Sequence, residues 1–347
     1  MNADKASFGK YAAGQTSISI DAVAAIAKSA GDKIMEIYNA PNFEEKIKDP
    51  KADGSPLTMA DLAANDIICS GLRKLYPGIP IISEEIKNAD YATRKNWAYF
   101  WCIDPLDGTK EFIKRNDEFT VNIGLCKAIG GGAAGGEPVL GVVYCPALSP
   151  PVMYKGVKGD GPPVKEECDA VGSKAGYDSF KTISPRVFRE SDPNLVVVAS
   201  KSHNSPETEA FVAKYKTPRR VSKGSSLKLL MVAEGSAHVY PRLAPTSEWD
   251  TCAAQAIVEC AGGRVLQHSG GQPCDEGEPV RYNKPNLLNP FFVVYGKVVL
   301  PKKEVKKKEV AFGEASSSSV LSNPFMFGAA CAGVAGVLYS VYTSVVV

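Results

Sequence analysis

Short apolar runs that alternate with amphipathic helices are the strongest constraint on the fold of this chain. Four such runs lie between residues 79 and 145, with the sequences IPIIS, YFWCI, FTVNIGLC and VLGVVYC. They are too short for typical helices and rich in β-branched and aromatic residues, which indicates buried strands. The spacing of apolar residues before them predicts two amphipathic helices, at 21–38 and 58–75.

The second half of the chain continues this alternation. It adds strand candidates NLVVVAS and AHVYP and helices at 206–216, 225–235 and 250–261. Strands interleaved with helices predict stacked layers of helix and sheet, an α+β architecture. The stretch 156–181 is rich in glycine, proline and charge, which is typical of a loop. We therefore expect two lobes, an N-terminal α+β lobe at 21–155 and a C-terminal α/β lobe at 156–300.

Charge and cysteine content exclude several classes of protein. The formal net charge is +2, and the run KKEVKKKE at 302–309 alone contributes five lysines minus two glutamates, +3, which leaves 2 − 3 = −1 for the rest. Such a balance is no footprint for a nucleic-acid polymer. The nine cysteines form no CxxC pair and are odd in number, so neither a zinc site nor a disulfide framework is indicated. Reduced, cytosol-facing thiols are expected.

The two ends of the chain differ in character. Residues 1–20 lack an apolar signal segment and are expected to be a flexible N-terminus. A linker rich in lysine and serine follows the second lobe at 301–324, and the uncharged segment 325–347 is long enough to cross a bilayer as one helix. Lysines before it would stay cytosolic, which predicts a catalytic domain tail-anchored to an intracellular membrane. Its glycine, alanine and serine content leaves a tail outside the membrane as the alternative.

Asp104 and Asp107 stand three residues apart in the segment WCIDPLDGTKEF, directly after a strand-like run. Two carboxylates this close repel, and each loses hydration on burial, unless a positive charge compensates both costs. A divalent cation would do so, and the proline between them leaves the Leu106 carbonyl free as a further ligand. Oxygen ligands favour Mg²⁺ or Mn²⁺ over zinc. The alternative is a turn in which both aspartates only cap the backbone.

Other acidic residues stand where site residues are common. Glu84 and Glu85 end the run IPIIS, and the carboxyl edge of a strand is the usual place for sites in α/β sheets. Asp250 opens the predicted helix 250–261, where an ordinary N-cap is the alternative. Asp61 follows Thr58 by three residues, which matches a capping box with aspartate in place of glutamate. These four acidic residues predict a metal site only in combination with Asp104 and Asp107.

Gly108 and Thr109 add features of a phosphate site. Backbone N–H groups at a helix start bind phosphate, and a threonine hydroxyl can orient a water molecule. Competing phosphate motifs are excluded, since the chain has no GxxxxGK[ST] segment and its paired aspartates are three apart instead of two. The GxGxxG match at 130–135 precedes a strand-like run instead of a helix, which predicts a hairpin loop. Metals beside a phosphate cradle indicate hydrolysis.

Three motifs in this order resemble the signature of the lithium-sensitive, Mg²⁺-dependent inositol monophosphatase superfamily. They are SEE at 83–85, DPLDGT at 104–109 and EWD at 248–250. The resemblance extends from Asp21 to Tyr295, so only the termini fall outside it. It implies the layered α-β-α-β-α sandwich of the sugar phosphatases.

Within the superfamily, the segments around 107–125 and 224–254 are most similar to the 3'(2'),5'-bisphosphate nucleotidases. Those enzymes convert 3'-phosphoadenosine 5'-phosphate to AMP and phosphate, a reaction of sulfur assimilation. The similarity implies substrate contacts by His203, Ser225, Lys228 and Arg242. A substrate with a second phosphate and a purine needs cationic partners away from the metals, which suits Lys228 and Arg242.

The resemblance also implies the catalytic arrangement. One Mg²⁺ would be bound by Glu84, Asp104 and the Leu106 carbonyl, and a second by Asp104, Asp107 and Asp250. Thr109 would orient a water molecule, and Asp61 would accept its proton. Substrate binding is further assigned to Gly108, Thr109 and Asp250. Two or three Mg²⁺ per site are expected, Mn²⁺ could replace them, and Li⁺ should inhibit.

Two alternatives to this function stay open. One is an inositol phosphate or polyphosphate phosphatase, because the metal core is shared within the superfamily. The other is a membrane-tethered protein that binds phosphonucleotides without cleaving them. In every case the expected partner is a small phosphorylated molecule and no nucleic-acid polymer, and the oligomeric state is left open.

Overall fold

The computed structural model describes residues 9–48, 50, 51, 54, 56–168, 180–199, 205–271, 274 and 276–300. They belong to one compact unit, Met1–Pro301. The expected linker at 301–324 and the expected anchor at 325–347 lie outside the described residues. Within the described part of the chain, no helix is both long enough and apolar enough to span a membrane.

The chain begins its described part with a hairpin, not with a flexible segment. Strands β1 (Lys10–Ala13) and β2 (Thr16–Ser19) pair antiparallel. Ile18 is fully buried, and Ser19 accepts a hydrogen bond from Ala22 N as the N-cap of the first helix. The expectation of a flexible N-terminus over 1–20 is therefore wrong for residues 10–19.

A seven-stranded sheet forms the centre of the first half. Its strands are β5 (Ile81–Ser83), β6 (Tyr99–Asp107), β7 (Thr120–Ala128), β8 (Gly136–Cys145), β9 (Val152–Val157), β10 (Val164–Glu167) and β11 (Phe180–Thr182). They lie in the order β11-β10-β9-β8-β7-β6-β5, and only the pair β5–β6 is parallel. The four strands predicted between 79 and 145 are confirmed as β5 to β8.

The stretch expected to be a dividing loop contributes two of these strands. β10 lies inside the stretch 156–181, and β11 begins at its end. The two strands extend the first sheet beyond β9. Glycine, proline and charge dominate this stretch because an edge hairpin needs few apolar side chains, and composition therefore hid the strands. The glycine-rich segment at 130–135 does join β7 to β8 as a hairpin loop, as predicted.

Two long helices cover the outer face of this sheet. They are α1 (Ile20–Tyr38) and α2 (Met59–Leu75), joined by η1 (Phe43–Lys46) and the short strands β3 (Ile47–Lys48) and β4 (Leu57–Thr58). Their apolar faces and one face of the sheet share a single buried cluster. The predicted helices at 21–38 and 58–75 are thus confirmed.

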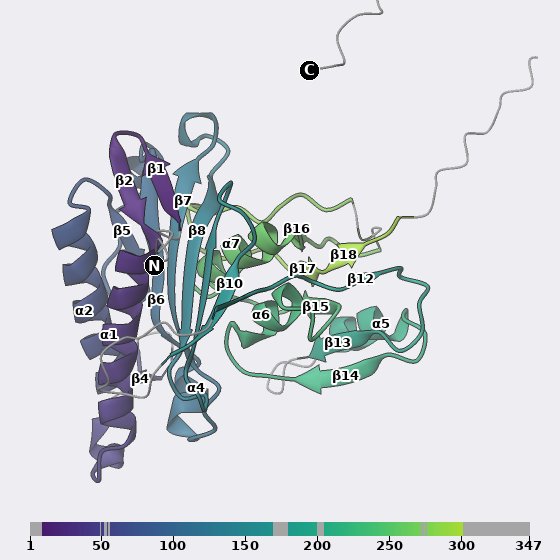
Figure 1. Cartoon of the computed structure of the whole chain (residues 1–347), viewed down its shortest axis with the longest axis horizontal. Coiled ribbons are helices and arrows are strands. Elements are labelled where there is room, and N and C mark those ends of the chain that lie inside the picture. Colours follow the sequence, from purple (N-terminus) through teal and green to yellow (C-terminus); the bar gives the residue numbers. More distant parts are fainter. Residues whose placement is uncertain are drawn as a thin grey trace, which may run out of the picture. The chain divides into compact units, whose positions relative to one another are not determined.

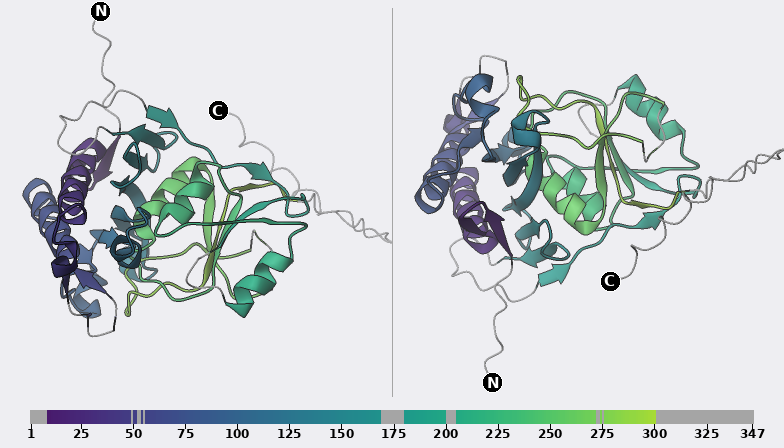
Figure 2. Two further views of the ribbon diagram at one scale, coloured as in Figure 1. Left: turned by 90° about the horizontal axis from the view of Figure 1, so that it is seen from below. Right: turned by 90° about the horizontal axis from the view of Figure 1, so that it is seen from above.

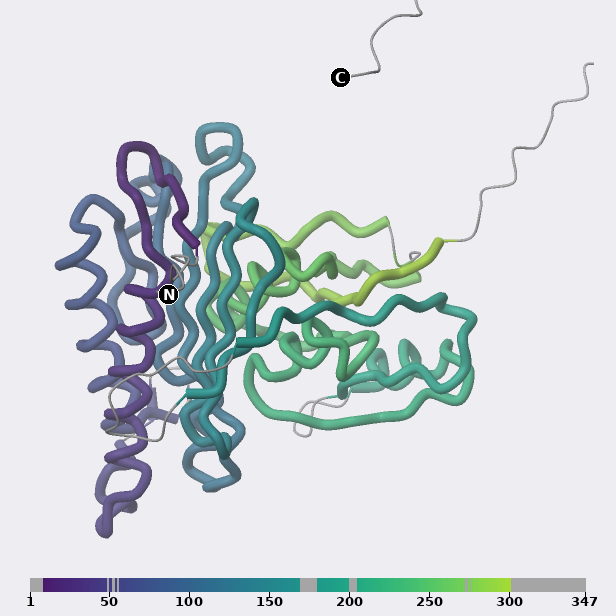
Figure 3. The backbone as a smooth tube through the Cα atoms, in the orientation of Figure 1, coloured from purple at the N-terminus to yellow at the C-terminus, as the bar shows by residue number. Residues whose placement is uncertain are grey.

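A five-stranded sheet organises the second half. Its strands are β13 (Val196–Ala199), β14 (Arg219–Ser222), β15 (Val239–Arg242), β16 (Arg264–Gln267) and β17 (Phe292–Tyr295), in the order β14-β13-β15-β17-β16. A small parallel pair, β12 (Val187–Phe188) with β18 (Lys297–Val298), flanks it. Figure 3 follows the chain from β11 across to this sheet.

Two helices lie between the sheets. α7 (Cys252–Ala261) packs on β7, β8 and β9 as well as on β16, and α6 (Leu227–Ala233) packs on α7, β15 and β17. The approach of α7 to the first sheet is close: a Cβ at Gly141 would lie 2.1 Å from the Ala253 carbonyl oxygen. α5 (Pro206–Ala213) covers the far side of the second sheet.

The result is five layers, with helix, sheet, helix, sheet and helix in succession (Figures 1 and 2). Three buried clusters fill the spaces between the layers: one between α1, α2 and the first sheet, one that joins both sheets through α6 and α7, and one between the second sheet and α5. This arrangement confirms the expected α-β-α-β-α sandwich. It places the ends of β5, β6 and β15 and the starts of α2, α6 and α7 within reach of one another.

Candidate active site

A β-bulge in β6 brings Asp104 and Asp107 to one side of the sheet. Asp104 pairs with Asn122 and Asp107 pairs with Thr120, so β6 takes three steps where β7 takes two. In a regular strand, residues three apart face opposite sides, and one inserted residue reverses that relation. The segment is therefore a bulge within β6, which runs to Asp107, and not a turn after a strand that ends at 103.

Asp250 completes a cluster of three carboxylates. One oxygen each of Asp104, Asp107 and Asp250 lies within 4.8 Å of the others. Asp250 does not cap α7, because that helix begins at Cys252 with Thr251 as its N-cap. Instead, Asp250 Oδ2 accepts a hydrogen bond from Ser247 N at 2.9 Å, which fixes the loop before α7.

The cluster concentrates negative charge in a buried place. Asp104 is only 2% exposed, and burial, followed by the charges of Glu84 and Asp107, raises its pKa well above the ordinary value. Burial and the charge of Asp107 raise the pKa of Asp250 to about 8. Raised pKa values mean that the ionised carboxylates lack compensation. An all-oxygen set of this charge fits a hard divalent cation such as Mg²⁺ or Mn²⁺.

Glu84 and Glu85 follow β5 and are held by a lysine. Lys51 Nζ lies 2.6 Å from Glu84 Oε1 and 2.5 Å from Glu85 Oε1. Burial raises the pKa of Glu85 to about 7 despite this partner. The Lys51 ammonium thus supplies part of the positive charge that this acidic region requires.

Asp61 lies at the start of α2, where it caps the helix and also contacts Thr109. Its Oδ2 accepts hydrogen bonds from Thr58 N at 2.7 Å and Thr58 Oγ1 at 2.5 Å, which confirms the predicted capping box. Its Oδ1 accepts a hydrogen bond from Thr109 Oγ1 at 3.2 Å. Burial raises the pKa of Asp61 to about 6, so this carboxyl group can take up a proton near neutral pH.

The residues between and after the two bulge aspartates are fixed by local contacts. Leu106 N donates to Asp104 Oδ1 at 3.0 Å, and the Leu106 carbonyl accepts from Thr109 Oγ1 at 3.3 Å. Gly108 has a φ of 96°, and a Cβ there would lie 3.1 Å from the Glu118 carbonyl oxygen. Only glycine suits this turn, after which α4 (Thr109–Ile113) begins.

A cavity of about 130 Å³ opens beside the carboxylates, with Asp107, Asp250, Lys228, Arg242 and Tyr240 in its walls. Lys228 Nζ lies 5.9 Å from the centroid of the Tyr240 ring, and burial lowers its pKa. Arg242 donates from Nη2 to the Pro245 carbonyl at 3.0 Å, while its buried Nε has no hydrogen-bond partner among the described residues. Lys228 and Arg242 therefore each retain N–H groups that can donate hydrogen bonds to an anionic ligand.

The structure gives the other predicted substrate residues different positions. Ser225 lines the cavity, but its Oγ donates to Asp107 Oδ2 at 2.7 Å, so its hydroxyl hydrogen is already used. His203 lies outside the described residues. Substrate contact by either residue stays a prediction.

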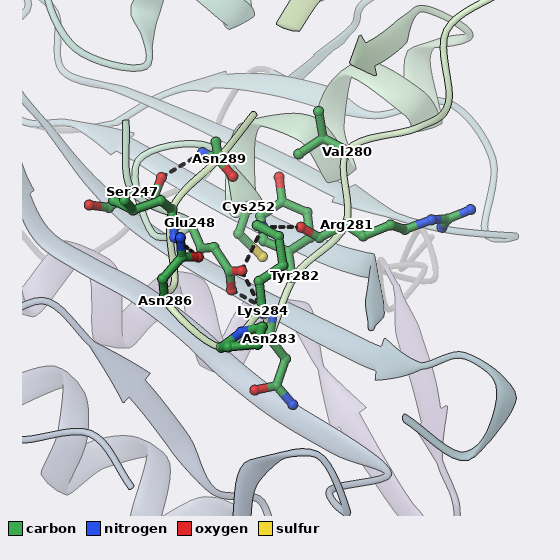
Figure 4. A network of polar contacts seen from close by, with 12 residues as sticks. Ser247, Glu248, Cys252, Val280, Arg281, Tyr282, Asn283, Lys284, Asn286 and Asn289 are labelled. Atoms are coloured by element: carbon green, nitrogen blue, oxygen red, sulfur yellow. Dashed lines mark hydrogen bonds and ion pairs between the residues drawn. The ribbon is translucent and has the colours of Figure 1, made fainter. Parts of the chain in front are cut away.

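Glu248, the first residue of the EWD motif, fastens the loop behind Asp250. It is fully buried and accepts from Asn283 N at 2.5 Å and Lys284 N at 2.8 Å, and its Oε1 lies 2.6 Å from Lys284 Nζ. Figure 4 shows these contacts next to Cys252, at the start of α7. The glutamate of the motif is thus a structural anchor for the segment that presents Asp250.

Sequence reasoning missed several polar residues around the cluster. They are Lys51, Thr120, Asn122, Ser226 and Glu248 as a structural anchor. Each contacts a residue far away in the chain, such as Glu84, Asp107 or Asn283. Only Thr120 and Asn122 could have been noticed in the sequence, because they alternate with apolar residues in one run and therefore share one face of the strand.

Known proteins are similar to this chain over most of its length. The model of the inositol monophosphatase family matches residues 16–311. The 3'(2'),5'-bisphosphate nucleotidase CysQ of Escherichia coli K12 is 41% identical over 276 residues, which are 79% of this chain and 98% of that protein. The protein of the same name from Salmonella typhimurium is 42% identical over 276 residues, with the same shares of both chains.

Solved structures show the same fold. The crystal structure of CysQ from Bacteroides thetaiotaomicron, at 41% identity, matches with a TM-score of 0.64 and covers 80% of this chain and 97% of its own. An inositol monophosphatase from Anabaena, at 21% identity, matches with a TM-score of 0.55 over 80% of this chain and 89% of its own. With its motifs, carboxylate cluster and five layers, this chain belongs to the inositol monophosphatase family.

Proposed function

We propose that this protein is a 3'(2'),5'-bisphosphate nucleotidase that removes the 3'-phosphate of 3'-phosphoadenosine 5'-phosphate to give AMP. The observation that supports this most is the juxtaposition of the three clustered carboxylates with a cavity walled by Lys228 and Arg242. A single-phosphate substrate would need only the carboxylate side, whereas a bisphosphate also needs cations at a distance from it. The names of the CysQ relatives support the same choice.

The acidic cluster would hold the divalent cations of the reaction. We assign this role to Glu84, Asp104, the Leu106 carbonyl, Asp107 and Asp250, with Mg²⁺ as the physiological ion, Mn²⁺ as a substitute and Li⁺ as an inhibitor. When bound, such cations lower the pKa of water and neutralise charge that develops on the leaving oxygen. The buried position of Asp104 and the raised pKa values of Asp104 and Asp250 support the assignment.

The chain's own groups would guide water and substrate. The Thr109 hydroxyl hydrogen is shared between Asp61 Oδ1 at 3.2 Å and the Leu106 carbonyl at 3.3 Å, which leaves the lone pairs of Oγ1 to accept a hydrogen bond from the attacking water. Asp61, with a pKa near 6, would receive the proton that this water loses. Backbone N–H groups of Gly108 and Thr109 would bind the phosphate under attack, and Lys228 and Arg242 the rest of the nucleotide.

Substrate choice tests the proposed activity. Purified protein in Mg²⁺ should release phosphate from 3'-phosphoadenosine 5'-phosphate in preference to inositol 1-phosphate at equal concentration, and Li⁺ should inhibit. Asp107→Asn should lower this rate by about 10³-fold or more while the far-UV spectrum and melting temperature stay close to those of the parent. Preference for inositol 1-phosphate would favour an inositol phosphatase, and binding of the nucleotide without release would favour a binding protein.

Lys228 and Arg242 should determine recognition of the second phosphate. Replacing either by alanine should raise KM for 3'-phosphoadenosine 5'-phosphate by roughly 10- to 100-fold, because a charge-assisted hydrogen bond contributes about 1.5–3 kcal/mol. Adenosine 3'-phosphate, which lacks the 5'-phosphate, should be affected much less. Arg220→Ala is the matched control, since Arg220 is exposed and paired with Glu209 on the second sheet's edge. Equal losses for both nucleotides would contradict the assignment.

Metal binding should stabilise the fold more at high pH than at low pH. Asp61, Glu85 and Asp250 have folded pKa values of about 6, 7 and 8, whereas they titrate near 4 in an unfolded chain. Between pH 4 and 8 the folded protein therefore holds more protons, and its free energy of unfolding falls as pH rises. A divalent cation bound at Asp250 replaces the proton of that carboxyl group, so Mg²⁺ should raise Tm by about 3 °C or more at pH 8 and by less at pH 5.5. Calorimetry that finds equal shifts, or none, would contradict metal binding at Asp250.

Membrane attachment is a proposal from the sequence alone. The uncharged segment 325–347 follows a lysine-rich run, and we propose that it anchors the protein to an intracellular membrane with the catalytic unit in the cytosol. Full-length protein should then sediment with membranes and resist extraction by alkaline carbonate, while a protein lacking 325–347 should not. Extraction of both by carbonate would refute the anchor without affecting the catalytic proposal.

A further inference from the structure

All hydrogen bonds to the Asp107 carboxylate from the described residues converge on one of its oxygens. Oδ2 accepts from Ser226 N at 2.6 Å, from Ser225 Oγ at 2.7 Å and from Asn122 Nδ2 at 3.4 Å. The other oxygen, Oδ1, receives no donor from this part of the chain. A carboxylate held in this way has one oxygen fixed by the protein and one left for a cation.

Behind these donors lies a buried polar cluster centred on β7. Thr120, Asn122 and Ser226 are each 1% exposed or less. Thr120 Oγ1 lies 2.6 Å from Ser225 Oγ, 2.8 Å from Ser226 Oγ and 3.1 Å from Asn122 Oδ1. Ser226 Oγ donates to Asn122 Oδ1 at 2.9 Å. Buried polar groups are retained only when they are satisfied, and here they satisfy each other.

The number of available hydroxyl and amide hydrogens limits which group can donate in each of these contacts. An ionised carboxylate only accepts, so Ser225 must give its single hydroxyl hydrogen to Asp107, and the Asn122 amide must turn its NH₂ toward the same oxygen. The Asn122 carbonyl oxygen then accepts from Ser226. The single hydroxyl hydrogen of Thr120 can then go to Ser225 Oγ at 2.6 Å or to Asn122 Oδ1 at 3.1 Å, and the shorter contact gives a chain from Thr120 through Ser225 to Asp107. Hydrogen bonds in such a chain strengthen one another.

We propose that Thr120 and Asn122 are positioning residues that orient Asp107 for cation binding. They fix Oδ2, directly from Asn122 and through Ser225 from Thr120, and leave Oδ1 without a donor from the described residues in a carboxylate that clusters with Asp104 and Asp250. Neither residue lines the cavity or belongs to the carboxylate cluster, so both act through Asp107. This inference rests on the proposed metal site, and it adds two residues that no sequence motif indicates.

The same cluster joins the two halves of the molecule at the site. Thr120 and Asn122 belong to β7 of the first sheet, whereas Ser225 and Ser226 lead into α6 beside the second sheet. Ser225 has a φ of 54°, and Gly224 N donates to the buried Glu118 Oε2 at 2.8 Å, so this loop is held in an unusual conformation by β7 and its preceding turn. The orientation of Asp107 and the placement of Lys228 on α6 therefore both depend on the segment that contains Ser225 and Ser226.

Direct metal binding tests the inference. Mn²⁺ would be titrated by calorimetry and electron paramagnetic resonance into the full chain and into Thr120→Val, Thr120→Ser and Asn122→Leu. Loss of a residue that orients a metal ligand costs roughly 10- to 100-fold in affinity, so Thr120→Val and Asn122→Leu should raise the Kd for Mn²⁺ by that factor. Thr120→Ser keeps the hydroxyl and should bind within about threefold of the parent.

A matched control separates orientation of Asp107 from a general loss of stability. Thr208→Val removes a buried hydroxyl that contacts Ser205 Oγ at 3.2 Å on α5, on the far side of the second sheet. It should leave the Kd unchanged. Turnover should show the same split, with a raised half-saturating Mg²⁺ concentration and a kcat at saturating Mg²⁺ within a few-fold of the parent.

The outcomes distinguish this inference from the proposed function. If the parent protein does not bind Mn²⁺, the metal site itself is wrong. If the parent binds and folded Thr120→Val binds equally well, Thr120 has only a structural role, and equal binding by folded Asn122→Leu would say the same of Asn122. Valine matches threonine in shape, so Thr120→Val decides the role of Thr120 even where Asn122→Leu fails to fold.

Discussion

Repulsion among one buried and two half-buried carboxylates is the constraint on which this site depends. The bulge in β6 directs Asp104 and Asp107 to the same side, and the loop before α7 adds Asp250. A fold that kept only these groups would be destabilised by its own charge, because ionised carboxylates out of water need compensation. Lys51 provides part of it at Glu84 and Glu85, and a divalent cation among the three aspartates would provide the rest.

The five layers serve to bring the ends of many elements to one place. β5, β6, α2 and α4 come from the first half of the chain, and β15, α6 and the loop before α7 come from the second. Asp107 is where the halves meet, since its carboxylate accepts hydrogen bonds from residues of both. Glu248 secures the opposite side of the loop through its buried contacts with Asn283 and Lys284 (Figure 4). Metal ligands and substrate-side cations are therefore parts of one connected structure.

Local patterns in the sequence predicted the elements and the carboxylates well. Short apolar runs located β5 to β8, apolar periodicity located α1 and α2, and the resemblance of the motifs that contain Asp104, Asp107 and Asp250 to a known family predicted one site. What could not be predicted depends on pairing between distant segments. The bulge needs β7 as a partner, and Lys51 reaches Glu84 from a turn-rich stretch with no periodicity. The strands β1, β2, β10 and β11 are three or four residues long, too short for a periodic signal.

The most direct test of this account is a diffraction measurement of anomalous scattering from crystals of the protein soaked with Mn²⁺. The account predicts strong peaks at bonding distance from carboxylate oxygens of Asp104, Asp107 and Asp250, with the Asp107 contact made through Oδ1. Absence of a peak among these three residues, at a Mn²⁺ concentration that supports phosphate release, would contradict it. So would a cation bound elsewhere while the three carboxylates stay without one.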